Sequence, residues 1–197
     1  MSHAAVAGQP RVLADAIPHA RARDAALIVG GALLTAACAQ ISIPVPGDPV
    51  PITGQTFAVM LCGAGLGAVR GSSAMALYWL LGLVGLPFYA DGDGGIHAAF
   101  GATGGYLIGF MVAAFVVGRL AEARLDREPW KALPLFTVGQ LIIFAFGVPW
   151  LAVHQGFSPS EAIALGFTPF ILGGIVKAVA AAALLPTAWR LVGRREG

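Results

Sequence analysis

Long stretches without charge are the strongest constraint on how this chain can fold. About 20 apolar residues are enough for a helix to cross the hydrocarbon core of a membrane. The backbone finds no water there, so helices are the expected spanning form, and no alternating barrel-type strands appear. Windows between charged residues fall at 25–47, 49–69, 71–90, 94–118, 132–160 and 162–189, and only the last is interrupted, by Lys177.

These windows predict an all-α membrane protein with six transmembrane helices. We expect the helices at about 25–42, 54–70, 72–88, 103–121, 133–152 and 168–191. They would form one membrane domain over residues 25–192, between a polar N-terminal arm (1–24) and a short tail (193–197).

The composition excludes several other classes of protein. Only 11% of the residues are charged, whereas soluble domains carry roughly 25%. The net charge of +2 gives no basis for nucleic-acid binding. Cys38 and Cys62 lie inside apolar windows, without the spacing of a disulfide framework or a metal site.

Basic residues orient the six expected helices. Those that fall on one side in a six-helix count are Arg11, Arg21, Arg23, Arg70, Arg119, Arg124, Arg127, Lys131, Arg190, Arg194 and Arg195. The charged residues of the connectors on the other side are all acidic: Asp48, Asp91, Asp93 and Glu161. The positive-inside rule therefore predicts a multi-pass protein of the cell (inner) membrane with both termini in the cytoplasm.

Lys177 is the one charged residue that lies far from the ends of an expected helix. It lies nine residues after Thr168, about 13 Å along the helix at 1.5 Å per residue. A charge near the middle of a membrane costs at least ~2.5 kcal/mol and usually faces a cavity or a partner. The acidic residues that could pair with it all lie on the outer side, so a carboxylate of a ligand is the other candidate.

The connector between the first two expected helices is rich in proline. It reads IPVPGDPVPITGQTF over residues 43–57, with four prolines followed by polar residues that enter the membrane edge. Proline fixes φ and removes backbone donors, so such a segment can lie beside helices with fewer unsatisfied groups. A rigid turn explains the prolines alone, but it explains Gln55 and Thr56 poorly.

Several segments together resemble the BioY family, the biotin-binding S components of energy-coupling-factor transporters. They are PITGQTFAV at 51–59 with the GLG that follows at 65–67, GLVGLPF at 82–88, GATGGYLIGF at 101–110, and Lys177 in the last window. The resemblance covers roughly residues 25–190. It departs from the family pattern G-D-x-x-K at Gly174, where the pattern has an aspartate.

The resemblance implies that biotin binds in an outward-facing pocket, with the proline-rich connector as a lid. Lys177 is then expected to meet the biotin carboxylate, and Asp91, with Gln55 and Thr53, the ureido N–H groups. Candidates for the apolar walls are Tyr89, Phe57, Tyr106 and Trp79.

The resemblance also implies partner proteins, namely a transmembrane coupling subunit and two ATPase subunits. The small-xxx-small pair Ala32 and Ala36 is a candidate docking surface for the coupling subunit, although packing within the chain explains it equally well. No G-x-x-x-x-G-K-[ST] motif is present, so ATP would be used only by the partners. We expect no cofactor, no metal and no catalytic residue; self-association stays open.

Three other functions remain open at this point. The chain could be an S component or solitary carrier for another small anionic vitamin, since related folds bind unlike ligands. It could be an intramembrane enzyme, with His97 near Asp91 and Asp93, although no catalytic motif accompanies them. It could also be a structural subunit with an empty pocket.

Overall fold

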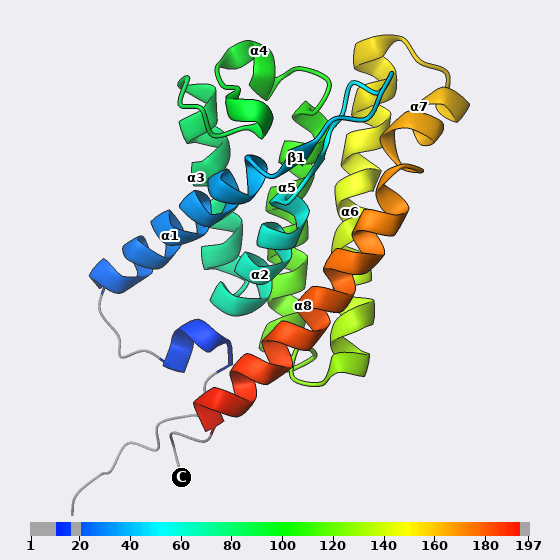
Figure 1. Cartoon of the computed structure of the whole chain (residues 1–197). Coiled ribbons are helices and arrows are strands. Elements are labelled where there is room, and N and C mark those ends of the chain that lie inside the picture. The colour runs from blue at the N-terminus through cyan, green and yellow to red at the C-terminus, as the bar shows by residue number, and fades with distance from the viewer. Residues whose placement is uncertain (1–10, 17–20, 194–197) are drawn as a thin grey trace, which may run out of the picture.

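The chain forms a bundle of helices with one short β-hairpin (Figure 1). The computed structural model describes residues 11–16 and 21–193. Its helices of 12 or more residues are α1 (Arg21–Ala39), α2 (Gln55–Leu66), α3 (Ala68–Leu83), α5 (Gly104–Glu122), α6 (Pro129–Gln155) and α8 (Phe170–Gly193). Shorter elements are η1 (Leu13–Ala16), β1 (Ser42–Ile43), β2 (Ile52–Thr53), η2 (Ala90–Gly92), α4 (Ile96–Ala99) and α7 (Pro159–Gly166).

Each of the six expected helices has a counterpart, but their lengths differ. Within the described residues, four helices are long and apolar enough to cross a membrane: α1, α5, α6 and α8. The helices α2 and α3 have only 12 and 16 residues, which is about 18 and 24 Å at 1.5 Å per residue. The expected arm and tail fall partly on residues 1–10, 17–20 and 194–197, which lie outside the described residues.

The expected boundary between the second and third helices was wrong. We expected it near Arg70, but α2 ends at Leu66 and α3 begins at Ala68. Gly67 alone joins them with φ +87°, a conformation that favours glycine because it lacks a Cβ. Arg70 therefore lies in the first turn of α3, where its guanidinium makes an ion pair of 3.2 Å with Asp24 of α1.

The proline-rich connector between α1 and α2 forms a short hairpin. Strands β1 and β2 pair antiparallel, with Ser42 opposite Thr53, and Figure 1 shows the hairpin running across the top of α5. Gly54 follows β2 directly, and a Cβ there would lie 2.7 Å from the carbonyl oxygen of Cys38. A larger residue would therefore push the start of α2 away from α1.

Helix α5 is the centre of the bundle. It is the most buried of the four long apolar helices and packs against α2, α3 and α6. Glycines permit these close approaches: Gly118 faces the backbone of Ala68, and Gly63 faces the backbone of Ala114. In a membrane, where lipid is as apolar as leucine, close packing of small residues is a main source of helix association.

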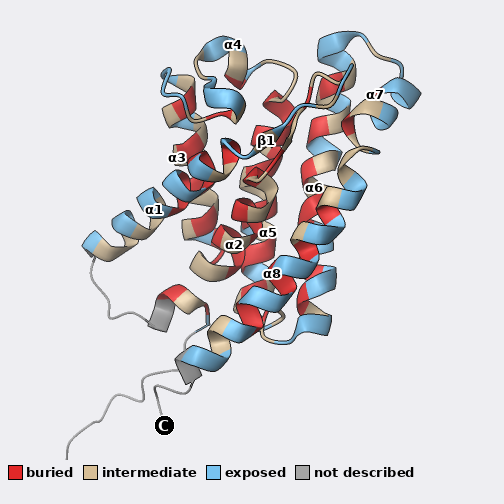
Figure 2. Cartoon of the chain, viewed as in Figure 1, coloured by how far each residue is buried: buried red, intermediate tan, exposed pale blue. Residues whose placement is uncertain are grey.

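The outward faces of the bundle are apolar. Figure 2 shows exposed residues along the outer sides of α1, α6 and α8, with buried residues turned toward α5. Large apolar side chains in the exposed class include Leu33 on α1 and Ile175 on α8. An exposed apolar belt of this kind suits contact with lipid rather than water.

The helices are tied together at the end of the bundle that lies opposite the hairpin. Glu122 of α5 accepts a hydrogen bond from the backbone N–H of Ala68, the first residue of α3, where a negative charge also complements the helix dipole. Asp126, in the loop before α6, accepts from the indole N–H of Trp189 on α8 at 2.6 Å. Burial raises the pKa of Asp126, although the hydrogen bond from Trp189 opposes this shift.

The close approach at Gly118 predicts a large effect from a single methyl group. In Gly118→Ala, the new Cβ would overlap the backbone of Ala68. Overpacking of this kind lowers the free energy of unfolding by about 1–3 kcal/mol. The unfolding temperature of the variant in detergent should therefore fall by about 3–10 °C.

Gly30→Ala is the matched control, because a Cβ at Gly30 meets nothing within 4 Å. It should leave the unfolding temperature unchanged or slightly raised, since alanine is the better helix former. Equal unfolding temperatures for the two variants would contradict the packing of α3 against α5.

Candidate functional site

An enclosed cavity lies beneath the hairpin, between α2, α5, α6 and α8. Its empty volume is about 620 Å³, counted with the part that opens to solvent. The lining residues are Val50, Pro51, Thr53, Gln55, Thr56, Tyr89, Ala90, Thr103, Tyr106, Leu107, Phe110, Gln140, Ile143, Phe144, Phe170, Gly174 and Lys177.

The cavity wall brings together five of the eight residues predicted from the sequence to contact the ligand. They are Lys177, Thr53, Gln55, Tyr89 and Tyr106. Val50 and Pro51 of the hairpin also line it, which puts the proline-rich connector over the cavity as the resemblance implied.

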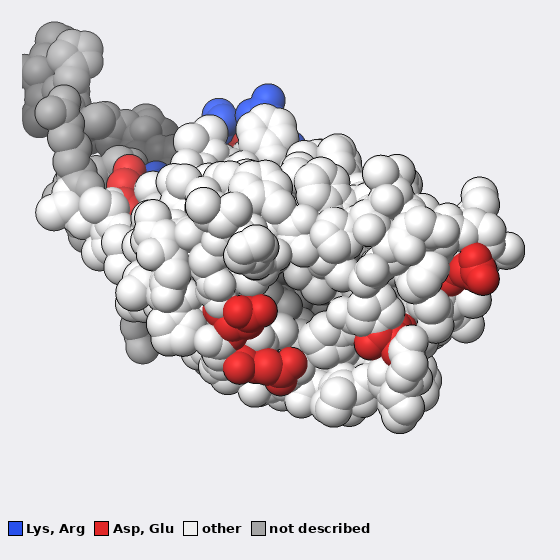
Figure 3. Space-filling view, turned by 90° about the horizontal axis from the view of Figure 1, so that it is seen from above, with Lys and Arg blue, Asp and Glu red and all other residues white. Residues whose placement is uncertain are grey.

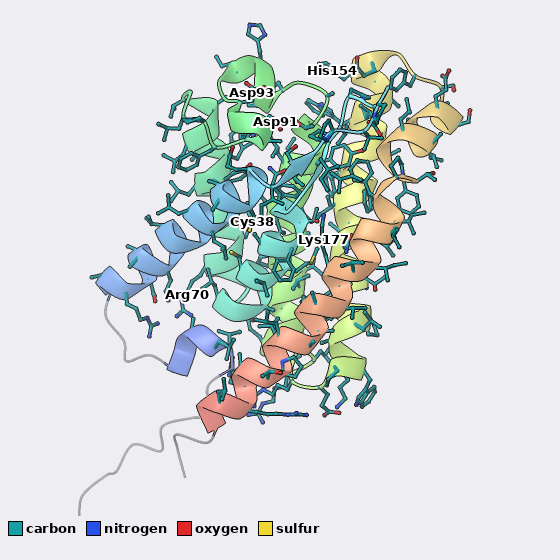
Figure 4. All side chains as sticks on the ribbon, viewed as in Figure 1. Cys38, Arg70, Asp91, Asp93, His154 and Lys177 are labelled. Carbon is teal, nitrogen blue, oxygen red and sulfur yellow. The ribbon has the colours of Figure 1, made fainter. Side chains whose placement is uncertain are left out.

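The Lys177 ammonium is held by neutral oxygen atoms. It donates to the backbone carbonyl of Thr53 at 2.5 Å and to the hydroxyl of Thr56 at 3.0 Å. No Asp or Glu of the described residues lies within 4.0 Å of it, so the alternative of a pair with an aspartate is not found among them. Figure 4 shows Lys177 midway along α8, well below Asp91 and Asp93. An ammonium has three donors, so one N–H remains for a ligand.

A chain of hydrogen bonds fixes the side chains at the start of α2. The Thr53 hydroxyl donates to the Gln55 Oε1 at 2.6 Å, and the Gln55 Nε2 donates to the Tyr78 hydroxyl at 2.5 Å. Thr53 and Gln55 are 8% and 7% exposed. Because these groups already have partners, the amide orientation of Gln55 is set before any ligand arrives.

Tyr89 and Tyr106 line the cavity with their rings while their hydroxyls bond elsewhere. Tyr89 donates to the carbonyl of Trp79 at 2.6 Å, and Tyr106 donates to the carbonyl of Gly166 at 2.8 Å. Burial raises the pKa of Tyr89 to about 12, so it stays a donor at neutral pH. Both residues therefore supply apolar wall, as predicted for them.

Three predicted residues do not line the cavity. Asp91 lies in η2 and lines an adjoining outer hollow with Asp93 and His97. Phe57 packs against the hydrophobic core. Trp79 makes an edge-to-face contact with Phe100, with ring centroids 5.7 Å apart. Asp91 has a left-handed backbone conformation, φ 58°, which the sequence did not reveal, and its neighbour Ala90 lines the cavity instead.

Gln140 of α6 is a cavity residue that the sequence reasoning missed. It is 8% exposed, and its Nε2 donates to the carbonyl of Gly174 at 2.6 Å. A Cβ at Gly174 would lie 2.6 Å from the Gln140 Oε1, so the carboxamide fills the space in which a side chain at 174 would begin. The signal was available, because Gln140 is the one amide side chain in the expected helix 133–152, and strongly polar residues inside membrane helices are usually functional or paired.

The predicted docking pair Ala32 and Ala36 lies inside the bundle. The two residues are 0% and 8% exposed and belong to the hydrophobic core. In this structure they serve packing of α1 within the chain, which is the alternative that the sequence left equally open. The exposed face of α1 carries Ala22, Ala26, Gly30 and Leu33 instead.

The end of the bundle that carries the hairpin is acidic. Figure 3 shows Asp and Glu side chains scattered over this face, with Lys and Arg only near one edge. Burial raises the pKa of Asp48 in the hairpin loop, although the hydrogen bond from the Val50 N–H opposes the shift. This bond also holds the turn that carries Val50 and Pro51 over the cavity.

The chemistry of the cavity is that of binding. Lys177 is the sole formally charged residue in its lining, and the remaining polar groups are amides and hydroxyls beside aromatic rings. Such a cavity suits a small ligand with one anionic group, an uncharged polar group and an apolar body. Within the described residues, no group of three or more His, Cys, Asp or Glu side chains could hold a metal ion.

Comparisons with known proteins agree with this picture. A family model described as the BioY family matches residues 10–194. The chain is 38% identical over 161 residues to a probable biotin transporter BioY from Pyrococcus horikoshii, covering 82% of this chain and 93% of that protein. It is 42% identical over 140 residues to the biotin transporter BioY from Thermotoga maritima, covering 71% and 81%.

A solved structure has the same fold. It is the crystal structure of the S-component for biotin from an ECF-type ABC transporter, with a TM-score of 0.76 and 22% identity. The match covers 88% of this chain and 95% of that one. With its long apolar helices, this chain is a multi-pass integral membrane protein. The resemblance found in its sequence motifs is confirmed: the chain belongs to the BioY family.

Proposed function

We propose that this chain is the biotin-binding S component of an energy-coupling-factor transporter. Its relatives are named biotin transporters, and its fold is that of a biotin S-component. The observation that carries the proposal is the cavity under the hairpin, whose lining holds a single formal charge, the Lys177 ammonium. Transport relatives and a binding cavity give no support for an enzyme.

The proposed topology has six membrane crossings and cytoplasmic termini. The helices α2 and α3 are short for a crossing, but the hairpin occupies the outer part of the α2 path (Figure 1). Irregular backbone at membrane depth is tolerated where it is buried in protein or lines a cavity, and Thr53 and Pro51 do line one. The one-sided basic residues of the sequence support the orientation.

Biotin has a charged group that suits the Lys177 side of the cavity and apolar rings that suit its aromatic and aliphatic side chains. Its valerate carboxylate would take the free N–H of Lys177, next to the start of α2. Its fused rings would lie against the aromatic and aliphatic side chains of α5, α6 and α8, such as Phe110, Ile143 and Phe170. Both charges lose water on binding, so the pair must be enclosed and hydrogen-bonded to be favourable. The hairpin residues Val50 and Pro51 would provide the enclosure.

The proposed partners are a transmembrane coupling subunit and two ATPase subunits that supply ATP hydrolysis. With Ala32 and Ala36 buried, the surface of α1 left for a neighbouring helix is the one with Ala22, Ala26 and Gly30. Small residues at four-residue spacing let helix backbones approach closely in lipid. A Cβ at Gly30 meets no atom of the described residues within 4 Å apart from its own stretch of helix, so a neighbouring helix would have room to approach.

Replacement of the ammonium tests the binding proposal. Lys177→Gln removes the charge but keeps an amide that can donate to the Thr53 carbonyl. Loss of a charge-assisted hydrogen bond costs about 1.5–3 kcal/mol, so biotin affinity in detergent should fall roughly 10- to 100-fold. Binding of biotin methyl ester, which has no anion, should change much less.

Two controls separate the explanations. Desthiobiotin keeps the urea and the carboxylate, so it should follow biotin in both proteins. Competition by unrelated anionic vitamins on the unmodified protein would favour a carrier for another ligand. An unchanged ratio of biotin to ester affinity in Lys177→Gln would remove Lys177 from the carboxylate site.

A bulky residue on the outer face of α1 tests the proposed coupling. Gly30→Trp projects into open space, so biotin binding by the purified chain should stay within about twofold of the unmodified value, since surface changes away from special features are small. Biotin uptake by cells that contain the coupling and ATPase subunits should fall strongly, because the indole would hold the neighbouring helix away. Unchanged uptake would place the coupling surface elsewhere.

A further inference from the structure

The side chain of Gln140 is oriented by the protein itself. The carbonyl of Gly174 can only accept, so the amide must turn its Nε2 toward it, and the hydrogen bond of 2.6 Å fixes the rotamer. The remaining edge of the carboxamide carries Oε1 and the second N–H. Among the described residues, no side chain or backbone group donates to this Oε1.

This free edge of the Gln140 carboxamide lies beside Gly174 of α8. Gly174 and Lys177 are three residues apart on α8, so they share one face of the helix, and both line the cavity together with Gln140. A side chain at 174 would begin 2.6 Å from the Gln140 Oε1. The glycine therefore leaves the room that the carboxamide takes at the cavity wall.

We infer that Gln140 is a specificity-determining residue of this chain: its Oε1 accepts a hydrogen bond from a ureido N–H of the bound ligand, in space left free by Gly174. The inference rests on the proposed binding of biotin. Lys177 takes the anionic end, and an uncharged acceptor is left for the uncharged polar end. Asp91, the acceptor expected from the sequence, does not line the cavity, whereas Gln140 does.

An amide acceptor also suits the charge of the site. With Gln140 and Gly174, the lining has a formal charge of +1 from Lys177, which a ligand carboxylate neutralises. A buried polar acceptor left without a donor is unfavourable, so ligands without the N–H group are rejected. The pair of Gln140 and Gly174 thus distinguishes ligands by the ureido end, independently of the carboxylate.

The test compares biotin with an analogue methylated on the ureido nitrogen atoms, in purified protein. Removing the acceptor in Gln140→Ala should weaken biotin binding about tenfold or more, and the ratio between biotin and the methylated analogue should shrink by a similar factor. Thr137→Ala, one turn earlier on α6 and outside the cavity lining, is the matched control and should leave both affinities unchanged.

A second substitution tests the shared space. Gly174→Asp in the unmodified background should weaken biotin binding, because its Cβ would lie 2.6 Å from the Gln140 Oε1 and must displace that carboxamide. In the Gln140→Ala background, the same aspartate has room and offers an acceptor in that volume, so it should restore biotin binding above that of Gln140→Ala alone. Gly174→Ala in that background should not restore it. Unfolding temperatures of all variants identify any that fail to fold.

The outcomes are distinct. If the unmodified protein binds no biotin, the proposed function fails. If it binds biotin and Gln140→Ala leaves the ratio of biotin to methylated analogue unchanged, Gln140 only shapes the wall and the inference is overturned. Failure of Gly174→Asp to rescue a folded Gln140→Ala protein would also contradict the shared position.

Discussion

The hydrogen bonds from the Lys177 ammonium to the Thr53 carbonyl and the Thr56 hydroxyl join the last helix to the start of α2. Thr53 ends the hairpin strand that covers the cavity, and Thr56 lies in the first turn of α2. One cationic group therefore connects the lid, the second helix and the last helix. Its hydrogen bonds offset part of the cost of a charge within the membrane, and its third donor leaves the site ready for an anion.

The hairpin lies between α1 and α2 in the chain, and its residues Val50, Pro51 and Thr53 form one side of the cavity. The short α2 begins beneath the outer end of the bundle, and Gly54 allows its first turn to approach the carbonyl of Cys38. The two strands of the hairpin pair with each other, and Lys177 donates to the backbone carbonyl of Thr53. The hairpin that covers the cavity and the polar residues that line it are thus adjacent in the chain. This explains why Thr53, Gln55 and Thr56 directly follow the prolines.

Some of this was predictable from sequence and some was not. Charge-free windows and the isolated Lys177 gave the helices and the cavity cation, because a charge in hydrocarbon needs a partner. The sequence left open whether Ala32 and Ala36 of α1 pack within the chain or face a partner, since lipid and protein interior are equally apolar and hydrophobicity does not separate Ala32 from Ala26. Asp91 was assigned to the ureido group from the family resemblance, whereas the structure places it in η2, in an adjoining hollow. The role of Gly174 depends on Gln140, 34 residues away in sequence.

The most direct measurement is a structure of the purified protein with biotin bound. The account predicts the valerate carboxylate within about 3 Å of the Lys177 Nζ, as for a charge-assisted hydrogen bond, with the hairpin closed over the rings. An ammonium still bonded only to Thr53 and Thr56, with biotin held elsewhere, would contradict it.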